Sequence, residues 1–158
     1  MTDNLDGLTI SSIKDKPDVF GVVANRIWKE WWEKKGQTEQ NVVDGLRKAL
    51  EGNLYYDGFA ASRNGTYFGS ALVIKSDMEE RPSYTPWVAA VFVEPECRGQ
   101  GVGAALVHYA AQNTFKNGVP HVYLCATKKN SSYYEKLGWK KIEEDAGADS
   151  LTIFIKSS

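Results

Sequence analysis

The sequence is poor in the residues that build disulfide frameworks and zinc sites. Its 158 residues include only two cysteines, Cys97 and Cys125, and two histidines. Neither cysteine belongs to a CxxC pair or lies beside a histidine cluster. We therefore expect neither a disulfide framework nor a Cys/His zinc site, and predict a protein without a metal.

An excess of one charge and a long apolar run are also missing. The 19 lysines and arginines face 20 aspartates and glutamates, so the formal net charge is −1. We therefore expect no attraction to nucleic acid or to an anionic membrane. Apolar runs fall far short of the roughly 20 residues that span a bilayer, and residues 1–6 lack both the basic and the apolar region of a signal peptide. We predict a cytoplasmic protein.

What is present fits an ordinary globular domain. The chain is 42% hydrophobic, 12% aromatic and 25% charged, a balance that supplies enough apolar side chains for a core. Its length suggests about one domain, and no repeat, low-complexity tract or linker divides it. We predict that residues 1–158 form a single domain.

Hydrophobic spacing and the positions of glycine and proline predict an α/β domain with a mixed sheet. The dipeptide Asn64-Gly65 favours a tight hairpin, because both residues accept positive φ. In chain order we expect a strand over 8–13, helices that open at Pro17 and after Thr38, strands over 55–63, 66–75 and 87–93, a helix over 101–117, a strand over 121–126, a short helix over 131–137, and strands over 139–143 and 151–155.

A glycine-rich turn between strand 87–93 and helix 101–117 is the most informative segment. Gly99, Gly101 and Gly103 lie at alternate positions and lead directly into the helix. Without a Cβ atom, glycine lets an anion approach the backbone, so that successive N–H groups converge on one phosphate. The helix N-terminus adds a partial positive charge, and Arg98 supplies a charged donor. The segment predicts a phosphate site.

The spacing of the glycines distinguishes between the possible phosphate-containing ligands. A dinucleotide loop needs GxGxxG and a second βαβ half, and a P-loop needs GxxxxGK[ST]; the chain has neither. Residues 98–103, RGQGVG, instead fit the pattern [RQ]xxGx[GA]. With residues 133–139, YYEKLGW, close to [FY]YxKLG[FW], the sequence resembles the GNAT N-acetyltransferase family.

This resemblance implies a fold and a set of cofactor contacts. The implied fold is a single GNAT-like domain, a mixed, mostly antiparallel sheet of about seven strands flanked by four helices. The implied co-substrate is acetyl-CoA: the backbone of Phe92 and Val93 would pair with its pantetheine arm. The expected pyrophosphate contacts are Arg98, Gly99, Gln100, Gly101, Val102, Gly103 and Ala104. Tyr134 matches the family's general acid; a core aromatic is the alternative reading.

The sequence gives weaker signals for the residues that would bind the acceptor amine. The tryptophans Trp28 and Trp31 are candidates for substrate contact, with core packing as the alternative. Asp77 and Glu79 are further candidates, and ion pairing with Arg81 explains them equally well. Glu94 is expected to be an exposed residue at the loop entrance rather than a general base. Because deprotonating a lysine-type amine near pH 7.4 costs about 4 kcal/mol, an amine of low pKa or a water relay is favoured.

The sequence thus predicts an acetyl-CoA-dependent N-acetyltransferase that acts by direct attack in a ternary complex. The acceptor is a primary amine, either a small molecule or a peptide N-terminus, and the enzyme is a monomer or a homodimer. Neither cysteine has an activating base beside it in the sequence, so we expect no acyl-enzyme. The alternative is a non-catalytic acyl-CoA-binding sensor or interaction module.

Overall fold

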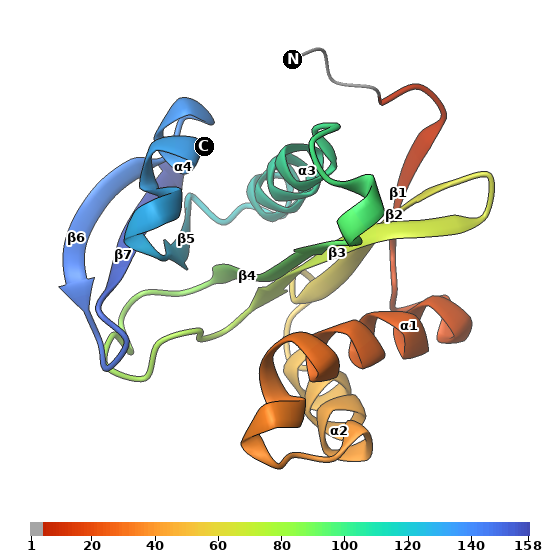
Figure 1. The fold of residues 1–158 in the computed structure, drawn as a ribbon. Coiled ribbons are helices and arrows are strands. Elements are labelled where there is room, and N and C mark those ends of the chain that lie inside the picture. Colours follow the sequence, from red (N-terminus) through yellow and green to blue (C-terminus); the bar gives the residue numbers. More distant parts are fainter. Residues whose placement is uncertain (1–4) are drawn as a thin grey trace.

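Seven strands form one sheet in the order β1-β2-β3-β4-β5-β7-β6 (Figure 1). The computed structural model describes residues 5–158. The strands are β1 (Leu8–Ser12), β2 (Asp57–Arg63), β3 (Thr66–Ile74), β4 (Trp87–Val93), β5 (His121–Ala126), β6 (Lys140–Ala146) and β7 (Leu151–Ser157). All neighbouring pairs are antiparallel except β4 and β5.

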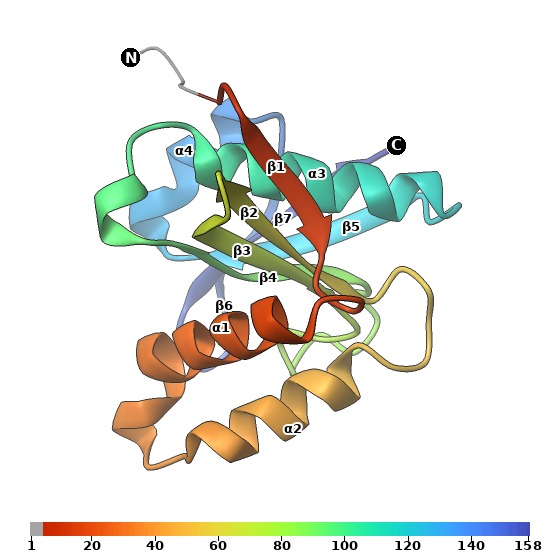
Figure 2. The same cartoon turned by 90° about the vertical axis from the view of Figure 1, so that its right-hand side faces the viewer.

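Helices cover both faces of the sheet. They are α1 (Pro17–Ile27), α2 (Glu39–Ala49), α3 (Val102–Lys116) and α4 (Ser131–Lys136). α1 and α2 lie on one face, and α3 and α4 on the other (Figures 1 and 2). Each face has its own core: Leu106 and Ala110 of α3 pack with Phe59 and Leu124, while Ile27 of α1 belongs to the core on the opposite face. The predicted α/β fold class is confirmed.

Turn and cap residues adopt the conformations that their residue types favour. The Thr38 hydroxyl accepts a hydrogen bond of 3.1 Å from the Asn41 N–H and so caps α2. Gly36, with φ of 81°, ends the preceding helical segment in the left-handed region. Asn64 and Gly65 have φ of 51° and 79°, which are the two positive values that a tight β2–β3 hairpin requires.

The first helix changes form where the sequence predicts it to continue. α1 ends at Ile27, Trp28–Trp32 forms a π-helix, and Glu33–Lys35 forms a short 3₁₀ turn. A π-helix carries more residues per turn than an α-helix and often marks a functional site. In the sequence, Phe20, Val23, Ile27 and Trp31 recur at spacings of three and four, which predicts one α-helix through Trp31. This prediction is wrong after Ile27.

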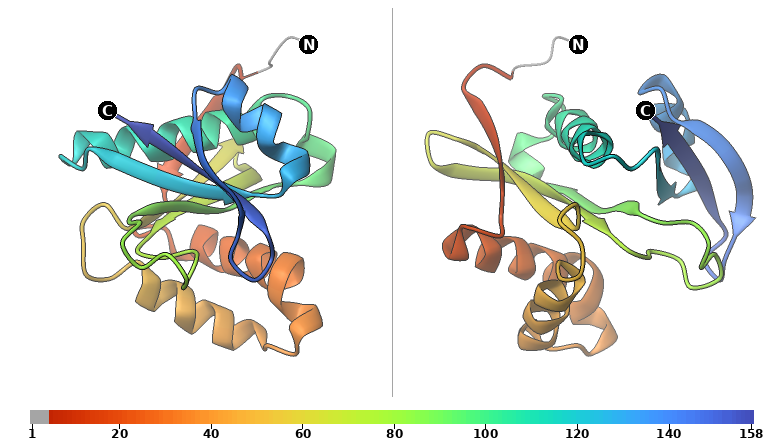
Figure 3. Two further views of the ribbon diagram at one scale, coloured as in Figure 1. Left: turned by 90° about the vertical axis from the view of Figure 1, so that its left-hand side faces the viewer. Right: turned by 180° about the vertical axis from the view of Figure 1, so that it is seen from behind.

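The sheet divides between β4 and β5. These two strands share a single paired position, Trp87 with Tyr123, and the halves of the sheet on either side lean apart (Figure 3). β4 is also irregular beside β3: its register shifts opposite Ala71, and Ala90 has a φ of 51°. A bulge of this kind re-aims the strand that follows it. The divergence leaves one edge of β4 open beyond the bulge.

Two possible features are missing from the part of the chain that the structure describes. None of the helices in residues 5–158 has the length and apolar character needed to cross a membrane. Within the same residues, no three histidine, cysteine, aspartate or glutamate side chains gather as they would to hold a metal ion.

Candidate functional site

A cavity of about 710 Å³ opens where β4 ends, between the start of α3 and the helix α4. Its lining includes every residue predicted to contact the cofactor except Gln100: Phe92, Val93, Arg98, Gly99, Gly101, Val102, Gly103 and Ala104. Tyr134 lines the same cavity from α4. The fold therefore brings together two motifs that lie about 35 residues apart in the sequence.

The glycine turn presents free backbone donors to this cavity. Gly99 and Gly101 have φ of 77° and 85°, values that favour glycine. Gly101 is the N-cap of α3, no side chain caps this helix, and its first turn carries no acidic residue. The first N–H groups of α3 therefore keep their hydrogen-bonding capacity, and the helix dipole makes this end positive. Such an end binds an anion.

Arg98 is held at the entrance to the turn. Its Nε donates to the carbonyl oxygen of Val93 over 2.9 Å, and its guanidinium lies 5.8 Å from the centre of the Phe92 ring. These two contacts fix the side chain while leaving other guanidinium N–H groups for a ligand. The turn therefore carries a positioned positive charge.

Tyr134 lines the cavity from α4 and has a strongly raised pKa. Its ring packs 5.8 Å from that of Phe154 and 5.1 Å from that of Tyr133, centre to centre. Burial, with smaller contributions from Tyr133 and Cys125, raises the pKa of Tyr134 to about 12. A phenol in this environment stays protonated at neutral pH and has one proton to donate.

The open edge of β4 supplies one more backbone group. Glu94 donates its N–H to the Phe68 carbonyl over 2.9 Å, and Phe92 pairs with Ser70 on β3. Because N–H groups alternate in direction along a strand, the N–H of Val93 points away from β3 and toward the gap. Both residues were predicted to offer their backbone to the cofactor. The N–H of Val93 faces the gap, whereas the N–H of Phe92 faces β3 within the sheet.

Glu94 does not lie exposed at the loop entrance, as the sequence suggested. Its carboxylate accepts a hydrogen bond of 2.5 Å from the Nε of Arg26, and its side chain is only 15% exposed. The prediction missed this pairing because Arg26 lies on α1, 68 positions away. The expectation of an exposed Glu94 is wrong. The ion pair with Arg26 joins α1 to the end of β4, which agrees with a structural role for Glu94.

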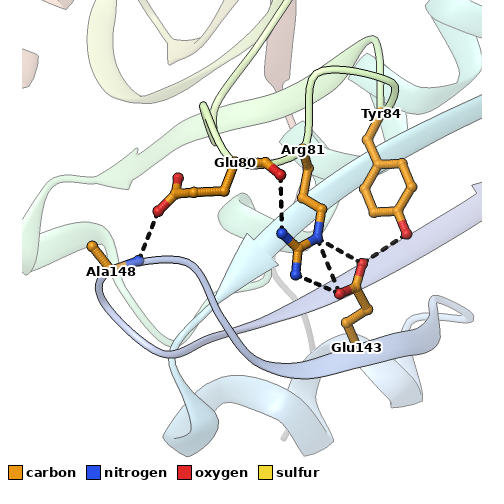
Figure 4. A network of polar contacts seen from close by, with 5 residues as sticks. All are labelled: Glu80, Arg81, Tyr84, Glu143 and Ala148. Carbon is orange, nitrogen blue, oxygen red and sulfur yellow. Dashed lines mark hydrogen bonds and ion pairs between the residues drawn. The ribbon is translucent and has the colours of Figure 1, made fainter.

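Asp77 and Glu79 do not pair with Arg81. The guanidinium of Arg81 instead binds Glu143 of β6, with a shortest contact of 2.7 Å (Figure 4). The Asp77 carboxylate accepts a hydrogen bond from the Cys125 thiol at 3.3 Å. Desolvation of this carboxylate raises the pKa of Asp77, against the opposing effect of the Cys125 hydrogen bond, although the residue as a whole stays exposed. Glu79 is exposed.

The predicted tryptophan contacts lie outside the described cavities. Trp28 donates its indole N–H to the Gln37 carbonyl over 2.7 Å and so closes the α1–α2 connection. Trp31 is 38% exposed. Sequence reasoning missed Glu30, which lines the cavity near the turn, and Asn130. The sequence holds no local signal for Glu30, because a helical glutamate on a surface is common.

Solved structures with the same fold bind coenzyme A or are called acetyltransferases. An aminoglycoside 6′-N-acetyltransferase complexed with coenzyme A is 18% identical with a TM-score of 0.71, and the match covers 94% of this chain and 96% of that one. A putative acetyltransferase from Salmonella typhimurium with its cofactor acetyl-CoA is also 18% identical, with a TM-score of 0.71 and coverage of 96% and 94%. An acetyltransferase from Streptococcus agalactiae is 18% identical, with a TM-score of 0.68 and coverage of 96% and 99%.

At these identities, the solved structures establish the fold and nothing finer. No curated protein matches the chain significantly in sequence. A family model does match: the acetyltransferase (GNAT) domain covers residues 55–141, which is more than half of the chain and includes both the glycine turn and Tyr134. With the seven-stranded sheet and the four helices in the matching arrangement, the chain belongs to the GNAT acetyltransferase family.

Proposed function

We propose that the protein is an N-acetyltransferase that moves an acetyl group from acetyl-CoA to a primary amine by direct attack. One observation carries the proposal: a single cavity joins an uncapped helix N-terminus to a tyrosine that stays protonated. The first group suits a pyrophosphate and the second suits a departing thiolate. Two of the similar structures were solved with coenzyme A or acetyl-CoA, which supports the choice of cofactor.

The cofactor end follows from the glycine turn. Backbone N–H groups from Arg98 to Ala104 would hold the pyrophosphate, and the Arg98 guanidinium would add a charge-assisted contact. Gly103 lines the cavity, and a Cβ atom on it would lie 3.5 Å from both the Tyr133 hydroxyl and a Val93 methyl group. A side chain beyond Cβ would take up space that the ligand needs.

The reacting end uses Val93 and Tyr134. Acetyl-CoA supplies an activated acetyl group, whose carbonyl carbon the neutral amine attacks as the C–S bond breaks. The Val93 N–H would donate to the carbonyl oxygen where negative charge develops. Tyr134 would give its proton to the departing thiolate and recover one from solvent. The proton lost by the amine nitrogen would leave through water.

The environments of the two cysteines favour direct transfer of the acetyl group over a mechanism with an acyl-enzyme intermediate. Cys97 is buried, and burial raises the pKa of its thiol. Burial and the neighbouring Asp77 carboxylate raise the pKa of Cys125 far above its ordinary value. A thiol must ionise to act as a nucleophile. Neither side chain is therefore suited to carry the acetyl group.

A thiol-release assay tests the proposal. The protein would be mixed with acetyl-CoA and a panel of primary amines: arylalkylamines, aminoglycosides, and peptides with a free N-terminus. We expect at least one amine to release free CoA in stoichiometric amount with an acetylated product in the mass spectrum. Tight acetyl-CoA binding without release for any amine would instead support a non-catalytic acyl-CoA sensor.

A further inference from the structure

The cavity at the end of β4 is lined from both faces of the sheet. The Val93 side chain packs in the core on the α3 face, and a Cβ atom on Gly103 would lie 3.5 Å from one of its methyl groups. The next side chain, that of Glu94, points the other way and binds Arg26 of α1. Because side chains alternate along a strand, Phe92 also points toward α1, and it too lines the cavity. The cavity therefore continues past the end of β4 to the α1 face.

Glu30 lines the cavity from this second face. It belongs to the π-helix that follows α1, four positions after Arg26. Four positions make about one helical turn, so the two side chains lie on the same side of the segment. Arg26 faces the end of β4, since its Nε lies 2.5 Å from the Glu94 carboxylate. Glu30 therefore faces the same strand end, about 6 Å further along the helix axis.

The Glu30 carboxylate is free to bind a ligand. Among residues 5–158, it is the only carboxylate in the cavity wall, and Arg98, at the phosphate turn, is the other charged lining residue. Within that part of the chain, the Glu30 carboxylate has no hydrogen bond and no ion pair. Arg26, one turn away, is engaged by Glu94 and by the Asn25 side chain. Because Glu30 is also exposed, both the cavity and water reach its charge.

The proposed reaction gives this charge a place. The acetyl oxygen would lie at the Val93 N–H, in the gap beside β4, and the sulfur at Tyr134, on the face of α3 and α4 (Figure 1). With the cofactor on that face, the acetyl carbon is open to attack from the α1 face, where Glu30 lies. The attacking nitrogen is neutral before the N–C bond forms and positive in the adduct. A carboxylate beside it stabilises the adduct more than the free amine.

We propose that Glu30 binds the amino group of the acceptor and takes the proton that its nitrogen loses. The inference rests on the proposed function, since it assigns a catalytic residue to the acceptor side of that reaction. As the N–C bond forms and the C–S bond breaks, the nitrogen gives one proton to Glu30 and Tyr134 gives one to the sulfur. Glu30 then releases its proton to water, and water restores the proton of Tyr134.

The charge of Glu30 also selects the acceptor. A primary aliphatic amine is mostly an ammonium ion in neutral solution, and a carboxylate without a partner attracts it. An acceptor that carries a carboxylate on the same carbon as its amine would bring a like charge to Glu30. The inferred substrate class is therefore amines without a neighbouring carboxylate, and it excludes free amino acids as good acceptors.

Glu30→Gln removes the charge and keeps the size of the side chain. With the panel amine of highest kcat/KM in the thiol-release assay, we expect kcat/KM to fall about tenfold or more, with a lower kcat. Acetyl-CoA affinity, measured by calorimetry, should stay within about threefold of the wild type, because the turn and Tyr134 are unchanged. Wild-type kcat/KM in this variant would overturn the inference.

Glu33→Gln is the matched control. Glu33 lies three positions later, in the short 3₁₀ turn, is exposed, and does not line the cavity. It loses the same unit of charge from the same region, yet its kcat/KM should stay within about twofold of the wild type. Both variants should melt within about 2 °C of the wild type, since each is a surface change. An equal loss of activity in both variants would overturn the inference.

A binding measurement separates this inference from the proposed function. In saturation-transfer NMR at pH 7 with CoA present, n-butylamine should contact the wild type and Glu33→Gln, but not Glu30→Gln. Norvaline, which is n-butylamine with a carboxylate on the amine carbon, should contact the wild type more weakly. This pattern without turnover of any amine would keep the role of Glu30 in binding and overturn the transferase.

The opposite results identify a failure of the inference alone. Turnover of a panel amine at the same kcat/KM in Glu30→Gln and the wild type would keep the transferase and overturn the role of Glu30. Contact of n-butylamine that survives in Glu30→Gln, or that is missing in the wild type, would overturn it as well. Equal contact of norvaline and n-butylamine with the wild type would overturn the selection by charge.

Discussion

At the scale of single residues, Tyr134 is the most direct test of the proposed chemistry. Tyr134→Phe keeps the ring that packs on Phe154 and removes the only proton this side chain can give. We expect kcat to fall about 100-fold or more, as for lost acid catalysis, while calorimetry shows acetyl-CoA affinity within about twofold of the wild type. Near-normal turnover in a folded variant would leave Tyr134 as a core aromatic.

The raised pKa of Tyr134 also constrains the pH profile. A phenol with a pKa of about 12 stays protonated, and therefore active as an acid, up to strongly alkaline pH. Its ionisation would lower the rate only as the pH rises through that value. Between about pH 6 and about pH 10, rate measurements should therefore show no alkaline fall that Tyr134→Phe removes.

Gly101 tests the phosphate site. Gly101→Val places a branched side chain at a φ of 85° where the backbone faces the cavity. We expect acetyl-CoA binding to weaken by about 2 kcal/mol, or about 30-fold, when measured by calorimetry.

Gly118→Val provides the matched control for this variant. Gly118 has a φ of 86° at the other end of α3, with open space around it. It should suffer similar backbone strain and lose stability, yet keep its affinity for acetyl-CoA. Equal affinities in both variants would contradict the assignment of the turn.

At the scale of elements, a polar network joins the β3–β4 loop to the β6–β7 hairpin (Figure 4). The Arg81 Nε lies 3.0 Å from both oxygens of Glu143, and the Tyr84 hydroxyl donates to Glu143 over 2.6 Å. Nearby, Glu80 accepts the Ala148 N–H over 2.8 Å. These contacts fix a loop that has no regular structure.

Glu143→Gln tests how much this network stabilises the fold. Hydrogen bonds from Arg81 and Tyr84 hold the pKa of Glu143 below its ordinary range. Its contribution is therefore present above about pH 4.3, the ordinary value, and is lost as the pH falls through the lowered pKa. At pH 7 we expect the melting temperature to fall by no more than about 4 °C, because both side chains keep about a third of their exposure and water weakens the pair.

The pH dependence distinguishes the network from a simple loss of packing. The difference in melting temperature between the wild type and Glu143→Gln should shrink as the pH is lowered toward about 3. Glu79→Gln, an exposed change in the same loop, should show no difference at either pH. A deficit of Glu143→Gln that persists at low pH would point to packing instead.

The sequence predicted elements that local patterns encode and missed those that distant contacts decide. Strands 87–93 and 121–126 were predicted at their observed bounds, because each is an apolar run bordered by proline or glycine. The π-helix was missed, since one extra residue per turn barely changes hydrophobic spacing over five residues. The Arg81–Glu143 pair spans 62 positions, and no local pattern specifies it.

In the candidate site, too, the sequence predicted what a local pattern encodes and missed what depends on packing between distant segments. The phosphate turn is local and carries its own glycine pattern, so the sequence alone predicts most of the residues from this turn that line the cavity. The apolar cavity of about 300 Å³ beneath α1 and α2 depends on how these helices pack on β3, which the sequence does not encode in one segment. The prediction named Trp28 and Trp31, but neither lines a described cavity: both lie in the π-helix, whose altered turn the sequence did not reveal.

At the scale of the whole molecule, we propose that residues 1–158 fold as one domain and that acetyl-CoA stabilises it as a unit. A ligand that binds only the native state adds about 2.7 kcal/mol at 100 times its Kd, which corresponds to a rise in melting temperature of roughly 5–11 °C for a chain of this length. Scanning calorimetry should show a single transition that moves upward with acetyl-CoA. NADH at equal concentration should move it far less; a larger shift with NADH would contradict the cofactor assignment.

The divergence of β4 from β5 also affects how fast backbone amides of β4 exchange their hydrogens with solvent. β4 keeps β3 on one side, but past Trp87 it has no hydrogen-bonded neighbour on the other. In deuterium exchange, the Val93 amide should therefore label within seconds while the Phe92 amide, directed at β3, stays protected far longer. If the Val93 N–H donates to the acetyl carbonyl oxygen as proposed, acetyl-CoA will slow the exchange of Val93 and leave that of Phe92 nearly unchanged. The cofactor would then protect an amide that the sheet itself leaves open to solvent.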